Sequence, residues 1–162
     1  KLTKKKLMIK ADVVIANKNW KKYIRTPRFY INNKLKKIEK KLNIFKKNNL
    51  SFTILLSGGK EVKKLNNQFR KKNKTTDILS FPFHEKFLLD ELLKKKKPHV
   101  YLGDIIINLS KIGGSIKDKK FFLNFDIIWL HGLAHLLGHR HRLNRDFLLM
   151  KKLESKLIKF SK

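Results

Sequence analysis

The amino-acid sequence predicts an α+β fold of the layered α/β type, with a single mixed sheet packed against helices. Short runs rich in β-branched and apolar residues alternate with segments in which apolar residues recur at helical spacing. The chain has 162 residues, 41% of them hydrophobic, with no internal repeat and no Gly/Ser-rich linker. We therefore expect residues 1–162 to form one domain around one core.

The β-branched and apolar runs predict the strands, and the apolar residues at helical spacing predict the helices. Apolar and β-branched runs predict strands at residues 7–15, 51–56, 78–83 and 101–108. The turn Ser57-Gly58-Gly59 precedes a helix that ends at Arg70, and Ser57 is expected to cap it. Helical spacing predicts the other helices at residues 33–45, 87–97, 121–137 and 147–158.

Four of the six histidines lie within eleven residues, between His131 and His141. His131 and His135 are four positions apart, which places them on one face of a helix about one turn from each other. A continuing helix would carry His139 about 12 Å along the axis from His131, too far for both to bind one ion. Gly138 can end the helix in the left-handed conformation and turn His141 back toward the pair.

We therefore predict a metal site formed by His131, His135 and His141 on a buried helix. Three neutral imidazoles leave a fourth position of a tetrahedral ion for water, as in catalytic zinc sites, where the water becomes a nucleophile near neutral pH. Without cysteine, only imidazole and carboxylate remain as strong ligands. Such a set suits zinc, nickel or copper, and we expect one divalent ion, Zn²⁺.

The helix that carries the first two ligands is predicted to be a core helix. Most residues between 121 and 137 are apolar, so the helix packs on several sides. The stretch is shorter than the roughly 20 apolar residues of a membrane span and contains Asp126 and two histidines. We therefore exclude a transmembrane helix here.

The histidine pattern, His-Gly-x-x-His-Leu-x-Gly-x-x-His from residue 131, resembles the signature of the YbeY family of metal-dependent endoribonucleases. Two further blocks are similar to family blocks and occur in the family's order over about residues 50–155. They are Leu-Asn-Asn-Gln-Phe-Arg at 65–70 with Thr-Asp-Ile-Leu-Ser-Phe-Pro at 76–82, and Leu-Gly-Asp-Ile at 102–105. Met150 and Glu154 fit a weaker pattern downstream.

The resemblance implies a single-strand-specific endoribonuclease that matures ribosomal RNA, including the 16S-type 3′ end, and takes part in ribosome quality control. Its partners would be RNA and the small ribosomal subunit, with neither DNA nor a membrane. Arg70 would clamp the scissile phosphate through paired guanidinium donors. Alternatively, Arg70 is a surface residue whose positive charge interacts favourably with the helix dipole at the C-terminal end of the helix.

The sequence departs from the family pattern close to the expected ion. His139-Arg140 stands where the family usually has Tyr-Asp, so a cation replaces an acid, and a lower metal affinity is expected. Thr75 occupies a place usually held by proline. Two other function classes therefore stay open: a zincin-like metalloprotease, and a non-catalytic ribosome-associated RNA-binding protein that keeps the metal for stability. The protease requires a glutamate after its first histidine, where this chain has Gly132.

The chain carries 41 Lys and Arg against 12 Asp and Glu, a formal net charge of +29. Such an excess favours a polyanionic partner such as nucleic acid, although an anionic membrane surface or a compositional bias toward lysine also produces it. Trp20, Tyr23 and Tyr30 lie among basic residues, where they either stack on bases or pack as core rings. Lys10 and Asp12 interrupt the early apolar run, so we expect no signal peptide and a cytoplasmic or organellar-matrix location.

Overall fold

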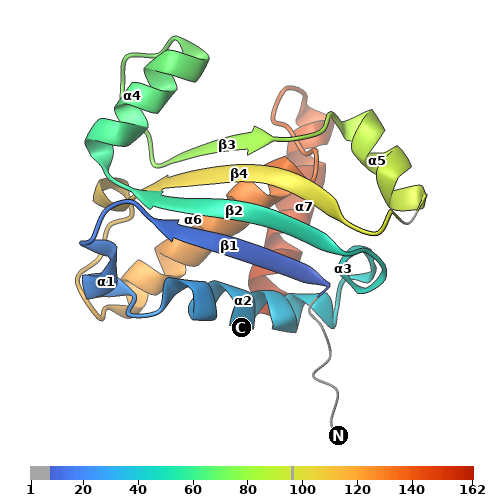
Figure 1. Cartoon of the computed structure of the whole chain (residues 1–162), viewed down its shortest axis with the longest axis horizontal. Coiled ribbons are helices and arrows are strands. Elements are labelled where there is room, and N and C mark those ends of the chain that lie inside the picture. Colours follow the sequence, from blue (N-terminus) through green and yellow to red (C-terminus); the bar gives the residue numbers. More distant parts are fainter. Residues whose placement is uncertain (1–7, 96) are drawn as a thin grey trace, which may run out of the picture.

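The computed structural model describes residues 8–95 and 97–162, and in them four strands form one mixed sheet (Figure 1). The strands are β1 (Ile9–Ile15), β2 (Leu50–Ser57), β3 (Ile78–Pro82) and β4 (Val100–Asn108), and their order in the sheet is β1-β2-β4-β3. β1, β2 and β4 are parallel, whereas β3 runs antiparallel to β4 at one edge. The predicted α+β class and mixed sheet are thus confirmed.

Helices cover both faces of the sheet. The helices are α1 (Trp20–Tyr23), α2 (Pro27–Glu39), α3 (Asn43–Lys47), α4 (Gly59–Arg70), α5 (Lys86–Lys94), α6 (Lys119–Leu136) and α7 (Asn144–Ser161), with a 3-10 turn at Leu109–Lys111. On one face α2 packs on β1 and α6 packs on β3 and β4, while α7 packs on α2 and α6 (Figure 1).

The opposite face of the sheet is covered at its β3–β4 edge by α4. Alternate residues of a strand point to opposite faces, and β3 follows this rule. Ile78 faces α6, since its Cδ1 lies 2.8 Å from the position that a Cβ on Gly132 would take. Leu79 instead forms a small buried cluster with Val62 of α4 and Ile106 of β4. β3 is therefore held between α4 and α6.

Two predicted elements differ from the structure in their bounds. The helix predicted over residues 33–45 is two helices, because α2 begins at Pro27, ends at Glu39, and is followed by an extended residue, Leu42, before α3. Proline favours the first turn of a helix, where its missing N–H costs nothing. Leu7 of the first predicted strand and Lys96 of the predicted helix over 87–97 lie outside the described residues.

The expected cap on α4 is also wrong. Gly58 occupies the N-cap position, and the hydroxyl of Ser57 instead donates to Oε2 of Glu61 at 3.0 Å. Ser57 is the last residue of β2 and is fully buried, so its side chain reaches the first turn of α4 without capping it.

The core is centred on α6, as expected for a helix that is apolar on several sides. Trp129, Leu130 and Leu133 are fully buried. Trp20 is a core residue as well, because its ring packs on Phe125 with centroids 5.4 Å apart and its indole N–H donates to the carbonyl of Ser57 at 2.8 Å. Across residues 8–95 and 97–162, the structure contains no helix with the length and apolarity that a membrane crossing requires.

Candidate metal centre

Three imidazoles converge at the C-terminal end of α6. His131 and His135 project from the last turns of the helix, and His141 comes from the loop after it. One ring nitrogen from each of the three residues lies within 4.8 Å of the others. The Nε2 atoms of His131 and His135 are 3.1 Å apart, close to the about 3.3 Å that separates two ligands of a tetrahedral ion at 2.0–2.1 Å. The cluster could therefore hold a metal ion.

The end of α6 brings His141 back to the other two rings, and Gly138 makes this possible. The backbone φ of Gly138 is +93°, as predicted for a helix-ending glycine. The N–H of His139 donates to the carbonyl of Ala134, and the N–H of Gly138 donates to that of His135. This pair of hydrogen bonds defines a Schellman motif. The motif reverses the chain so that His141 meets His135 in the last turn of α6 and His131 one turn before it.

Hydrogen bonds on the far side of two rings decide which nitrogen faces the cluster. Nδ1 of His131 lies 2.5 Å from Oε1 of Glu154 in α7, and Nδ1 of His135 lies 2.9 Å from the carbonyl oxygen of His139. Both partners are acceptors, so each Nδ1 carries the proton and each Nε2 presents a lone pair to the cluster. Carboxylate and carbonyl partners of this kind orient histidine ligands in metal sites.

The electrostatics of the site favour a neutral His135 imidazole and an ionised Glu154 carboxylate. Burial, reinforced by the neighbouring His131, lowers the pKa of His135 from 6.5 to about 4, so this ring is neutral at physiological pH. Burial opposes ionisation of Glu154, but the hydrogen bonds from His131 and Lys151 outweigh it and hold the pKa of this carboxyl below its usual range. Lys151 lies 3.1 Å from Oε2 of Glu154.

The cluster opens onto a cleft of about 500 Å³ between β3 and the end of α6, which we call the metal cleft. Arg70, at the end of α4, lines it together with the histidines and donates to the carbonyl of Ser80 at 3.1 Å. Its guanidinium also lies over the ring of Phe81, 5.7 Å from the centroid. Three further cations line the cleft, namely Lys86, Arg140 and Arg142. This environment attracts anions.

His139 and Arg140, which replace the family's usual Tyr-Asp, do not join the three-ring cluster. The backbone of His139 contributes, since its carbonyl accepts from His135, while its side chain lines the cleft. Burial, followed by the charge of Lys86, lowers the pKa of the His139 imidazole. Arg140 is exposed at the cleft wall. The departure from the family pattern therefore adds a cation to the rim of the cleft.

Three other residues at the site were not predicted as site residues from the sequence. Glu154 falls at the spacing of buried residues in α7, between Met150 and Leu157, and a carboxylate at such a position signals a buried partner. Asp77, just before β3, and Ser80, in the middle of that strand, line the metal cleft. The hydroxyl of Ser80 is buried and has no hydrogen-bond partner within the part of the chain that the structure describes.

The acids that the sequence places near the histidines lie away from the cluster. Asp126 is a core residue whose carboxylate accepts from Tyr30 and Trp129, both at 3.0 Å, and pairs with Lys34 at 2.9 Å. Asp146 lines a neighbouring hollow beside Arg140. Asp126 therefore ties α2 to α6 and contributes to the fold.

Comparisons with known proteins agree with this arrangement. The family model described as Endoribonuclease YbeY matches residues 14–162. A protein named Endoribonuclease YbeY from Pelagibacter ubique (strain HTCC1062) is 41% identical over 157 residues, which cover 96% of this chain and 97% of that protein. A protein of the same name from Ehrlichia canis (strain Jake) is 31% identical over 149 residues, covering 91% of this chain and 90% of its own length.

A solved structure gives the same fold. The solution structure of TM1509 from Thermotoga maritima matches with a TM-score of 0.50 at 22% identity, covering 92% of this chain and 88% of that chain. The family model extends over β2, β3, β4, α6 and the histidine cluster. The chain therefore belongs to the YbeY family.

Proposed function

We propose that this protein is a metal-dependent endoribonuclease that cleaves single-stranded RNA. The observation that carries the proposal is the convergence of His131, His135 and His141 in a cleft lined by Arg70 and three other cations. Names of relatives support the RNA substrate. The volume of the cleft, about 500 Å³, leaves room for a phosphodiester beside the three rings.

The donor set fits one zinc ion. The Nε2 atoms of His131 and His135 lie at near-tetrahedral spacing, and His141 brings a third ring nitrogen within 4.8 Å of them, as a catalytic zinc site requires. The lowered pKa of His135 keeps that donor unprotonated at physiological pH. When bound, the ion would polarise the scissile phosphate and lower the pKa of water at its open position. Glu154 holds the His131 ring in the productive tautomer, and the carbonyl of His139 does the same for His135.

Arg70 would bind the substrate phosphate and stabilise the negative charge that builds on it in the transition state. A guanidinium offers paired donors that match phosphate oxygens, and only some of those of Arg70 are used by the carbonyl of Ser80. The guanidinium also lies over the ring of Phe81, 5.7 Å from its centroid, a cation–π contact that helps to hold it beside the cleft. The remaining donors are available to a phosphate in the cleft.

We further propose that the substrate is ribosomal RNA, with the 16S-type 3′ end of the small subunit as a cleavage site. Maturation and quality control of ribosomes would then be the biological roles, and the reaction would take place in the cytoplasm. The family membership and the net charge of +29 support a partner as anionic as the ribosome.

Gly132 argues against the protease alternative. A Cβ at this position would lie 2.8 Å from Ile78 and 3.0 Å from Ile105, so the residue after the first histidine packs directly against the sheet. A zincin protease needs a glutamate there as its general base. A glutamate side chain has no room at this position in the present packing.

Cleavage assays test the function. A labelled single-stranded RNA should be cut in the presence of zinc and left intact with chelator or by the His131→Ala variant, and its duplex form should be cut far more slowly. Casein should stay intact in the same reactions. If the zinc-loaded protein cleaves no RNA, and His131→Ala loses only stability, the protein is a metal-stabilised binder. Preferred cleavage within an RNA that carries the 3′ end of the small-subunit ribosomal RNA tests the finer proposal.

Arg70 variants test the assigned phosphate contact. Arg70→Gln should lower kcat by about 10²–10³, the typical cost of removing one preorganised donor to a developing charge, without changing zinc affinity. Arg70→Lys should restore only part of the rate, since an ammonium cannot offer the paired geometry. Lys71→Gln, next to it and also exposed, is the matched control and should retain the wild-type rate. A wild-type kcat in Arg70→Gln would refute the role.

A further inference from the structure

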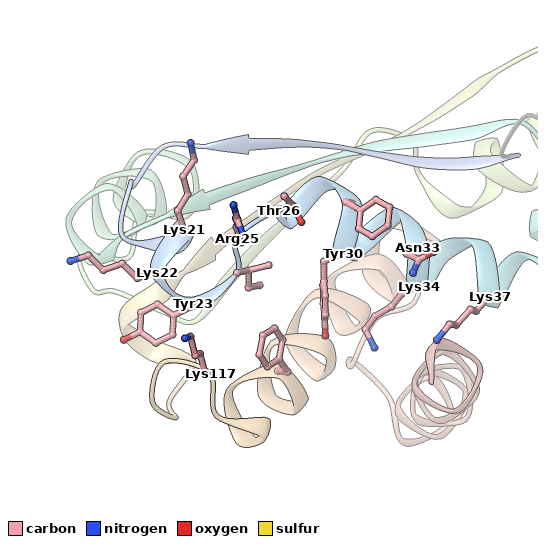
Figure 2. Close-up of a pocket in the computed structure, with 13 residues that line it drawn as sticks. Lys21, Lys22, Tyr23, Arg25, Thr26, Tyr30, Asn33, Lys34, Lys37 and Lys117 are labelled. Carbon is pink, nitrogen blue, oxygen red and sulfur yellow. The ribbon is translucent and has the colours of Figure 1, made fainter.

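A second basic hollow lies far from the histidine cluster, and we call it the α2 pocket. It has a volume of about 740 Å³ and lies between α1, α2 and the start of α6 (Figure 2). Tyr30 and Lys34 extend from α2 toward α6, and Lys117 lies on the chain segment that leads into α6. The cations that line it are Lys21, Lys22, Arg25, Lys34, Lys37 and Lys117.

The positive charge of the α2 pocket is not balanced locally. No Asp or Glu lines it, and within residues 8–95 and 97–162 only Lys34 of its six cations has a carboxylate partner, Asp126. Arg25, Lys37 and Lys117 are all exposed. Like charges gathered around one hollow repel one another and raise its positive potential, so an anionic ligand would relieve this repulsion.

Aromatic rings stand among these cations. Tyr23, Tyr30 and Phe122 line the pocket and are partly buried, and they pack on the rings at the start of α6. Phe29 is different, because 70% of its surface is exposed. It also lines an adjacent hollow of about 570 Å³ on the other side of α2. An exposed phenyl ring beside unpaired cations is an arrangement on which nucleic-acid bases stack.

We propose that the α2 pocket binds a segment of single-stranded RNA, with its phosphates on the cations and a base on the ring of Phe29. The inference rests on the proposed function, since it assigns a second contact to the RNA whose cleavage occurs in the metal cleft. An acidic protein segment would satisfy the charges as well, but it would gain nothing from the exposed ring. The combination of cations and ring therefore favours RNA.

The two sites are connected by α6. Phe122 lines the α2 pocket near the start of the helix, and His135 lies near its end, so thirteen residues at 1.5 Å rise separate them by about 20 Å along the axis. A stacked strand with about 3.4 Å rise needs roughly six nucleotides to cover that length. An RNA shorter than this can occupy the metal cleft alone, whereas a longer one reaches both sites.

Equilibrium binding without cleavage tests the charge contribution. In the presence of chelator, the triple variant Arg25→Gln, Lys37→Gln and Lys117→Gln should bind a labelled oligouridylate at least about tenfold more weakly than wild type. The slope of log affinity against log salt should shrink by about two, at roughly 0.7 per lost phosphate contact. The matched control removes the same number of charges from exposed lysines outside the pocket, with Lys41, Lys46 and Lys47 changed to Gln. Equal losses in the two triple variants would overturn the proposal.

Phe29 tests the stacking contribution. Phe29→Leu keeps an apolar side chain but removes the ring, and affinity for the oligouridylate should fall by about tenfold. Phe29→Trp should restore affinity, and the added indole fluorescence should be quenched by RNA. A polyglutamate that displaces RNA as effectively as unlabelled RNA does, with no effect of Phe29→Leu, would identify an acidic-protein site and overturn the RNA assignment.

Substrate length separates this inference from the proposed function. An RNA of about four nucleotides should be cleaved equally by wild type and by the pocket triple variant, because it cannot span the two sites. An RNA of about twenty nucleotides should show a raised KM and an unchanged kcat in the triple variant. If both RNAs are cleaved with the wild-type KM, the pocket inference fails while the nuclease assignment stands. If neither is cleaved by wild type, the proposed function fails while the binding results still test the pocket.

Discussion

Each histidine of the cluster has two ring nitrogens, and contacts outside the cluster decide which of them is available to a metal. Glu154 and the carbonyl of His139 accept the Nδ1 protons of His131 and His135, so both Nε2 atoms are free as donors. The proton on a free imidazole exchanges between the two nitrogens, and an acceptor held on one side removes that choice. Contacts within the protein thus set the tautomers that a metal requires of His131 and His135.

Glu154→Gln should weaken zinc binding by about 10- to 100-fold, the usual effect of removing an acceptor behind a histidine ligand. The neutral amide accepts less strongly and can also turn its NH₂ group toward Nδ1. Competition with a chromophoric chelator measures the affinity, and the melting temperature shows that the variant is folded. Lys152→Gln, exposed on the same helix, is the control. An unchanged zinc affinity in folded Glu154→Gln would show that Glu154 serves the fold only.

The metal-free protein should lose stability between pH 6.5 and about pH 4. The pKa of His135 falls from 6.5 to about 4 on folding, so within this window the unfolded chain binds a proton that the folded state does not. This contribution to the free energy of unfolding is complete above pH 6.5 and declines as the pH falls. Urea unfolding of chelator-treated protein across this range measures it.

A variant without the titrating ring provides the comparison. His135→Gln should show a flatter dependence of unfolding free energy on pH, whereas His99→Gln, at an exposed position, should follow wild type. If His135→Gln and wild type lose stability in parallel, another group causes the loss.

Some roles of residues follow from the sequence, and others depend on distant contacts. The spacing of His131 and His135, with a helix-ending glycine before His141, predicts local convergence because all three lie on one short segment. Glu154 is 23 residues from His131, so their contact depends on how α7 packs against α6. Local periodicity carries no information on that packing.

At the scale of elements, the most important local structure is the end of α6. The positive φ of Gly138 allows two hydrogen bonds that reverse the chain within a few residues. A side chain at this position would be strained, and a Cβ would lie 2.3 Å from Cδ of Lys86. The position of His141 relative to the helix therefore depends on a residue that does not itself bind metal.

Gly138→Ala should lower the free energy of unfolding by about 1–3 kcal/mol, the cost of holding a non-glycine residue in this backbone region. It should also weaken zinc binding, because relief of the strain displaces His141. Urea unfolding and chelator competition measure the two effects. Gly59→Ala, in the first turn of α4 where a Cβ meets its nearest neighbour at 3.4 Å, is the control. Wild-type values for both quantities would contradict the role of Gly138.

The prediction of elements succeeds where periodicity is strong and fails at their ends. The apolar runs give β2, β3 and β4 within one or two residues, because these segments are rich in the apolar and β-branched residues that favour strands. The C-terminal bound of α2 could not be predicted, since Leu42 and Phe45 continue the helical spacing beyond Glu39 although the chain turns there. Packing against β1 decides where that helix lies.

At the scale of the whole molecule, metal binding at the histidine cluster should raise the free energy of unfolding of the protein. An ion that binds the folded state alone adds about 2.7 kcal/mol to the free energy of unfolding at roughly 100 times its Kd. Zinc should therefore raise the melting temperature of the chelator-treated protein in a concentration-dependent way. His131→Ala should respond far less, whereas His99→Gln should respond as wild type does. Equal zinc responses in His131→Ala and wild type would indicate binding elsewhere.

The strand order described above leaves β1 and β3 at the edges of the sheet, each paired on one side. Unpaired edges invite intermolecular strand addition, and proteins block it with charges and proline. β1 carries Lys10 and Asp12 along its length, and β3 ends at Pro82, which has no N–H to offer. Both edge strands thus discourage the intermolecular strand pairing through which exposed sheet edges aggregate.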